Sequence, residues 1–252
     1  MNNNAIKGEY LLKIYSDLIS MIQNERVELN KKNIDPNDYD IVDVEVHVES
    51  KKLFELFEIY YQYFTGEYLS FVSSLFKIID QVEEIESIKS VTSLASESIY
   101  NSLIKKSNLK KNDYVRLSKI TLLDHIKDIT ILIVKDIEDK EGDREALTES
   151  ESQHLLLLAL LHDIGKIMPL MGLYGIQKTE GTHEVRSRIF IDMIIEGGSY
   201  SETLLHPLKR IAKNLLNMEK GETNGTISRF HEYDKRARLV ELLRLKDEDQ
   251  NK

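Results

Sequence analysis

The sequence predicts an all-α fold. Its 252 residues include only three prolines and eleven glycines, so few positions favour turns and long helices are expected. Apolar residues recur at three- and four-residue steps along most of the chain, which is the period of an amphipathic helix. Such segments run from about residue 6 to residue 27, and over residues 52–64 and 67–86, where tyrosine and phenylalanine are frequent.

Two stretches depart from the helical period. Segment 40–49, DIVDVEVHVE, alternates apolar and polar residues and contains four valines, so it predicts a short strand with His47 in solvent. Segment 85–113 is rich in serine and lysine and predicts a helix followed by a connection, with a boundary near Lys110. We therefore divide the chain into a mostly helical N-terminal region of unknown role, residues 1–112, and a second domain, residues 113–252.

The second domain is expected to be a bundle of helices. Helical periodicity resumes after the boundary and is interrupted by glycine-containing loops at residues 141–143 and 221–225. The predicted helices are 113–137, 149–163, 181–196, 201–218 and 227–246.

The composition excludes several classes of function. A formal net charge of −9 argues against broad electrostatic binding of nucleic acid, although it leaves room for a single strand in a narrow groove. The absence of cysteine excludes disulfides and thiolate metal ligands. The longest apolar run, residues 155–161, is far too short to span a membrane, and the polar N-terminus lacks a signal-peptide core. We expect a cytoplasmic protein with no membrane partner.

The run LLLLALLHDIGK, residues 155–166, is the most informative segment. Seven apolar residues lead directly into His162 and Asp163, Gly165 then breaks the helix, and Lys166 follows. A helix that is apolar all round belongs in a core, where a carboxylate is costly unless it is paired. An imidazole beside a carboxylate at such a helix end indicates part of a metal site.

Three other helices carry polar groups on largely apolar faces. These groups are His125 in TLLDHIKDITIL, His183 in THEVRSRIFIDMII and Asp234 in RFHEYDKRARLVEL. Considered alone, each of these side chains could equally be a hydrogen-bonded core residue or a metal ligand. Together, His125, His162, Asp163 and Asp234 form a nitrogen and oxygen set that suits one divalent ion of Mn, Fe, Co, Mg or Zn.

The order His125, then His162-Asp163, then Asp234 resembles the HD superfamily of metal-dependent phosphohydrolases. The resemblance covers about residues 113–246, and HDIGK is its most specific part. It implies an HD-domain helical bundle whose core holds one or two divalent ions. The ions would activate a water molecule and neutralise charge on a phosphoryl group.

The resemblance also implies roles for individual residues. Asp163 would orient or deprotonate the attacking water as well as bind metal, and Lys166 would contact a substrate phosphate, against the alternative of a solvated lysine at a helix end. His183 resembles a ligand of a second metal or of phosphate. Its partner would have to be His206, which precedes a proline and is expected at a surface helix start. We therefore expect one well-held ion, and we expect His154 to cap its helix or to face solvent.

Motifs of several HD subfamilies are missing from this sequence, which narrows the range of expected substrates. The pair is not followed by the Glu-Asp of stringent-response nucleotide hydrolases or by the motifs of deoxynucleoside triphosphate hydrolases, and no Gly-Tyr-Pro occurs. The resemblance favours hydrolysis of a phosphomonoester or phosphodiester in a phosphorylated small molecule, a nucleotide or a nucleotide-like compound. The alternatives are a non-catalytic HD-fold module for binding or signalling, and an accessory nuclease acting on single-stranded nucleic acid. The oligomeric state is left open.

Overall fold

The fold is all-α, as the sequence predicts. The computed structural model describes residues 48–91, 111–138 and 147–250, and within these ranges there is no strand, only an isolated bridge between Lys89 and Thr121. The expected helix near residues 6–27, the expected strand up to residue 47 with His47, and the loop at residues 141–143 lie outside the described residues.

In chain order, the part of the chain that the structure describes contains the following α-helices. They are α2 (Lys51–Tyr61), α3 (Gly66–Asp80), α5 (Lys111–Leu117), α6 (Leu122–Glu138), α7 (Glu149–Leu161), α8 (Met168–Leu173), α9 (His183–Gly197), α10 (Glu202–Lys220) and α11 (Gly225–Gln250). Three single 3-10 turns, η1 (Ile85–Ser87), η2 (Ile164–Lys166) and η3 (Lys178–Glu180), lie between them. Among the described helices, none is long and apolar enough to cross a bilayer.

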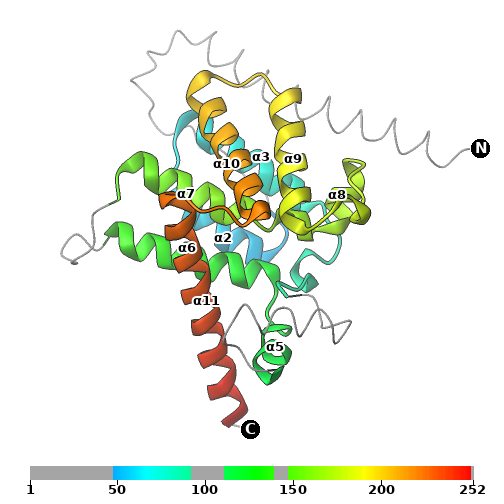
Figure 1. Cartoon of the computed structure of the whole chain (residues 1–252), viewed down its shortest axis with the longest axis vertical. Coiled ribbons are helices and arrows are strands. Elements are labelled where there is room, and N and C mark those ends of the chain that lie inside the picture. The colour runs from blue at the N-terminus through cyan, green and yellow to red at the C-terminus, as the bar shows by residue number, and fades with distance from the viewer. Residues whose placement is uncertain (1–47, 92–110, 139–146, 251–252) are drawn as a thin grey trace, which may run out of the picture.

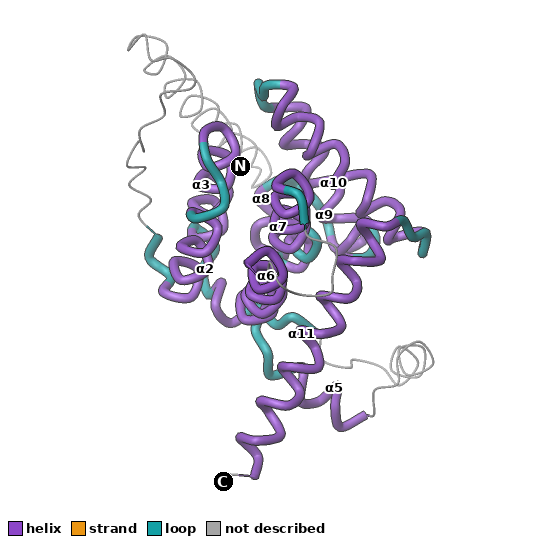
Figure 2. The backbone as a smooth tube through the Cα atoms, turned by 90° about the vertical axis from the view of Figure 1, so that its left-hand side faces the viewer, coloured by secondary structure: helices purple, strands orange, loops and turns teal. Residues whose placement is uncertain are grey.

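Helix α7 lies at the centre of the bundle, next to α6, α10 and α11 (Figures 1 and 2). Its residues 155–161 are all buried, because neighbouring helices cover it on every side. Helices α2 and α3 belong to the same hydrophobic core, and the Tyr60 hydroxyl of α2 donates a hydrogen bond to the Leu156 carbonyl of α7 at 2.9 Å. Residues 48–91 therefore contribute to the core that holds α7. The division of the chain near residue 112 stays a prediction.

The start of α7 corrects the expectation for His154. The helix is capped six residues earlier by Thr148, whose hydroxyl accepts from the Glu151 amide while the Glu151 carboxylate accepts from the Thr148 amide. His154 therefore lies in the second turn and faces α10, with only 3% of its surface exposed. Its Nε2 accepts a hydrogen bond from the Asn214 amide at 2.9 Å.

The predicted helix over residues 113–137 is in fact two helices, α5 and α6. The break has a tertiary cause: the Leu122 amide donates to the Ile88 carbonyl at 2.7 Å, and the Ser90 amide donates to the Ile120 carbonyl at 3.1 Å. This pairing with a distant segment replaces the helical hydrogen bonds. Thr121 directly precedes α6 and caps it, because its hydroxyl accepts from the Asp124 amide at 3.2 Å.

Candidate metal centre

The turn after α7 places His162 and Asp163 side by side. The helix ends at Leu161, the His162 amide still donates to the Leu158 carbonyl, and the chain then tightens into η2. Both side chains are buried, and His162 Nε2 lies 3.4 Å from Asp163 Oδ2. The change of helix type lets two consecutive residues reach one point, which adjacent positions of a regular helix would not do.

His125 of α6 joins this pair. One ligand atom from each of His125, His162 and Asp163 lies within 4.8 Å of the others, and all three residues are buried. His125 and His162 lie 37 positions apart in the sequence, so this group exists only in the folded chain. It is a buried set of two imidazoles and one carboxylate that could hold a metal ion.

The orientation of His162 is fixed by its own helix. Its Nδ1 lies 2.8 Å from the Ala159 carbonyl oxygen. Because a carbonyl can only accept, Nδ1 carries the hydrogen and the lone pair of the neutral ring is on Nε2. That is the nitrogen near Asp163, as a metal ligand would require.

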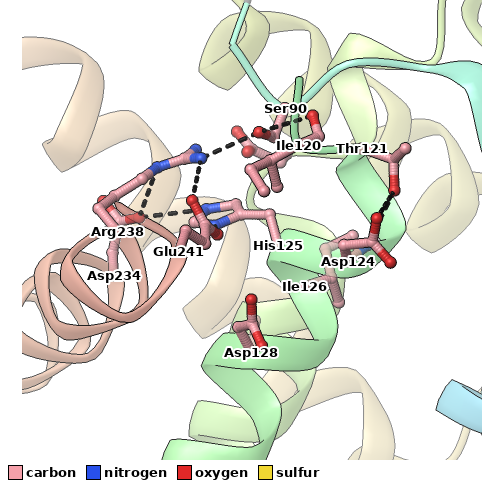
Figure 3. A network of polar contacts seen from close by, with 12 residues as sticks. Ser90, Ile120, Thr121, Asp124, His125, Ile126, Asp128, Asp234, Arg238 and Glu241 are labelled. Carbon is pink, nitrogen blue, oxygen red and sulfur yellow. Dashed lines mark hydrogen bonds and ion pairs between the residues drawn. The ribbon is translucent and has the colours of Figure 1, made fainter. Parts of the chain in front are cut away.

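His125 has the same arrangement, as Figure 3 shows. Its Nδ1 lies 2.6 Å from Glu241 Oε1 of α11. Among the described residues no hydrogen bond reaches its buried Nε2: Asp234 Oδ1 lies 3.2 Å away, without the alignment that a hydrogen bond needs. A buried ring nitrogen whose only contact is this unaligned ion pair is poorly satisfied, and a metal ion bound beside it would satisfy it. The residues present therefore fit a divalent cation.

Asp234 of α11 lies beside His125, at the edge of the group, with 35% of its side chain exposed. Partial burial would raise the pKa of this carboxyl, but His125 and Arg238 outweigh burial and hold the pKa below its usual value. Asp234 is therefore an anion at neutral pH. Conversely, burial and Arg238 lower the pKa of His125, whereas Asp234 and Glu241 raise it above its usual value.

Asp163 is surrounded by cationic and imidazole groups. Its Oδ2 accepts from Lys166 Nζ at 2.6 Å, and its Oδ1 lies 3.0 Å from His183 Nε2 of α9. Burial alone would raise the pKa of Asp163, but His162, Lys166 and His183 hold it well below its usual value. Lys166 also donates to the Ser90 carbonyl at 2.7 Å. The lysine is thus an internal partner of Asp163 and not a solvated helix end.

The two histidines considered for a second ion lie in different places. His183 contacts Asp163, and its Nε2 is also 3.1 Å from Glu184 Oε1. His206 is exposed on α10, where its charge acts on His154. The expected surface position of His206 is confirmed, and the structure brings only His183 to the candidate site.

Helix α9 packs directly on the η2 turn. The Gly165 amide donates to the Ser187 hydroxyl at 2.9 Å, and this hydroxyl donates to the His162 carbonyl at 2.9 Å. Arg186 Nε donates to the Gly165 carbonyl at 2.9 Å. A β-carbon at position 165 would lie 2.7 Å from the Ser187 amide nitrogen, so only glycine permits this approach. The contact fixes both the His162–Asp163 turn and the position of His183.

Glu241 is the site residue that the sequence reasoning did not select. It lies seven residues after Asp234, on the same face of α11, so helical spacing could have identified it. The surrounding run LVELLRL is apolar on all sides of the helix, which hides the face on which position 241 lies. Ser90, which contacts both Lys166 and Arg238, had no signal in the sequence.

Comparison with known proteins finds no match: no family model, no curated protein and no solved structure matches the chain. The resemblance to the HD superfamily therefore rests on HDIGK and on the order of four residues, and it stays a prediction. The description of the site rests on its geometry.

Proposed function

We propose that this protein hydrolyses a phosphoester in a nucleotide or nucleotide-like substrate, using a divalent metal ion held by His125, His162, Asp163 and Asp234. The observation that carries the proposal is the buried group of His125, His162 and Asp163, with both imidazoles anchored through Nδ1. Lys166 pairs with Asp163, but no hydrogen bond reaches His125 Nε2 among the described residues, and a metal ion would satisfy that nitrogen. Nitrogen and oxygen donors favour Mn, Fe, Co, Mg or Zn.

A divalent ion at this position would supply Lewis acidity, lowering the pKa of a water molecule and neutralising charge on a phosphoryl oxygen. Asp163 is kept ionised by its neighbours, so it can accept a hydrogen bond from that water and orient it. Lys166 has three N–H donors, of which two meet Asp163 and Ser90. We propose that the third contacts a substrate phosphate.

The exposure of the site residues suggests how substrate reaches them. His125, His162 and Asp163 are buried, whereas Asp234 is 35% and His183 is 33% exposed. We propose that substrate approaches on the side of these two residues.

The test combines elemental analysis of the purified full-length protein with a hydrolysis screen. The substrates are nucleoside mono-, di- and triphosphates, cyclic dinucleotides and short single-stranded oligonucleotides. We expect about one divalent ion per chain and turnover of a nucleotide. Metal without turnover of any substrate would instead indicate a binding or signalling module, and cleavage confined to oligonucleotides would indicate a nuclease. A protein that neither contains nor binds a divalent ion would overturn the proposal.

A further inference from the structure

Glu241 is a carboxylate with no exposed surface, on a helix that is otherwise rich in solvated charges. A buried carboxylate is unfavourable unless both oxygens have partners. Here Oε1 lies 2.6 Å from His125 Nδ1, and Oε2 accepts from Arg238 Nη1 at 3.0 Å (Figure 3). Both partners belong to the surroundings of the candidate metal site.

Arg238 is itself held in place. Its Nη1 also donates to the Ser90 hydroxyl at 2.9 Å, and the Ser90 amide and hydroxyl both donate to the Ile120 carbonyl. This carbonyl precedes His125 by five residues. The Glu241 carboxylate is thus held between His125 and an arginine that is anchored on the segment leading into α6.

The contact determines which nitrogen of His125 can bind metal. An ionised carboxylate can only accept, so Nδ1 keeps its hydrogen and Nε2 is the nitrogen available as a ligand. Nε2 is also the buried nitrogen that no hydrogen bond reaches among the described residues. We propose that Glu241 is a positioning residue of the metal site: it orients His125, fixes its tautomer and increases the basicity of Nε2. The inference rests on the proposed function.

The alternative is that Glu241 only joins α11 to α6. The same pair of helices offers a matched control, because Arg244 of α11 pairs with Asp128 of α6 at 2.9 Å. Asp128 lies about one helical turn from His125, but its ion pair with Arg244 does not involve the His125 imidazole. Asp128→Asn therefore weakens the junction of the two helices and leaves the His125–Glu241 contact in place.

The first measurement is Co²⁺ affinity, by chelator competition, of the full-length protein stripped of metal. In Glu241→Gln the side chain keeps its size, but its amide can donate as well as accept and no longer enforces one tautomer. We expect Glu241→Gln to bind Co²⁺ roughly 10- to 100-fold more weakly, whereas Asp128→Asn stays within about twofold of the wild type. Glu241→Asp keeps the charge but has a shorter side chain, which moves the carboxylate away from His125, so this variant should also bind Co²⁺ more weakly. It replaces the glutamine variant in the test if that variant does not fold.

The second measurement is NMR of histidine side chains in ¹⁵N-labelled protein loaded with Zn²⁺. The wild type should show a hydrogen-bonded, slowly exchanging Nδ1–H signal for His125, and Glu241→Gln should lose it while Asp128→Asn retains it. Equal Co²⁺ affinity of the wild type and both Glu241 variants would overturn the positioning role and leave the proposed function intact. A wild type that binds no Co²⁺ or Zn²⁺ would overturn both.

Discussion

Asp163 contacts three side chains at the candidate site, those of His162, Lys166 and His183. We expect Asp163→Asn to abolish hydrolysis and to lower metal content, because asparagine has nearly the same shape but no charge for the ion or the attacking water. Elemental analysis and turnover of the best substrate check this. Asp192→Asn, which breaks an ion pair on the surface of α9, should change neither quantity. Near-normal turnover of the Asp163 variant would show that the site is assigned wrongly.

Lys166 is predicted to contact substrate phosphate in addition to its internal partners. Lys166→Met keeps the aliphatic stem but removes all three donors, so we expect a raised KM or a lowered kcat with metal content retained. Steady-state kinetics and elemental analysis of the same preparation separate these quantities. Unchanged kinetics would restrict Lys166 to its contacts with Asp163 and Ser90.

Because His154 is buried, we expect the free energy of unfolding to fall as the pH is lowered. Burial, together with the charges of Arg210 and His206, lowers the pKa of this imidazole to about 4. As the pH falls, the unfolded chain takes up this proton near pH 6.5, before the folded chain can, so acid favours unfolding over this window. Between pH 7 and pH 5 the loss is about 2 kcal/mol of unfolding free energy.

His154→Gln provides the test, because glutamine still offers an acceptor to Asn214 but does not titrate. Urea unfolding of metal-free protein at pH 7 and pH 5 should show a smaller loss of stability in the variant. An equal loss in the two proteins would mean that other groups account for the acid sensitivity.

Among the elements, α9 and the η2 turn depend on each other through Gly165. We expect Gly165→Ala to destabilise the protein by about 1–3 kcal/mol, because the new methyl group meets the backbone of α9, which cannot move aside as a side chain would. The displacement should also move His183 away from Asp163. Denaturant unfolding and metal affinity check both effects. Gly172→Ala, at a helical position with open space around it, is the control and should be neutral or slightly stabilising.

For the whole molecule, the candidate metal site joins α6 and the end of α7, which are consecutive helices, to α11 near the other end of the described chain. An ion that binds only the folded chain stabilises it by about 3 kcal/mol at a concentration 100-fold above its Kd. We expect chelation to lower Tm by roughly 5–10 °C for a domain of this size. Thermal unfolding with and without chelator measures the shift. Asp163→Asn should show a much smaller shift in Tm. A wild-type Tm that changes with neither chelator nor added metal would contradict the assignment of a metal site.

The sequence by itself determined the class of fold and the centre of the site. Helical periodicity with few breakers gave an all-α chain, and the apolar run before His162 identified the buried helix α7. The stripe around His125 placed that residue correctly in the core. These features were predictable because they depend on the spacing of apolar residues over a few turns, which determines where a helix forms and which face it buries.

Only the tertiary structure decided how the site is completed. The break between α5 and α6 comes from hydrogen bonds to residues 88–90. Thr121 and Asp124 have the spacing of a helix start, but the pairing with residues 88–90 has no local pattern. Likewise, Glu241 meets His125 across 116 positions of sequence. Such contacts depend on which helix faces pack together. Residues 239–245 of α11 are apolar on several sides of the helix, so their pattern does not identify the face that packs on α6. The helices follow from local spacing, whereas the partners of their buried polar groups follow from packing.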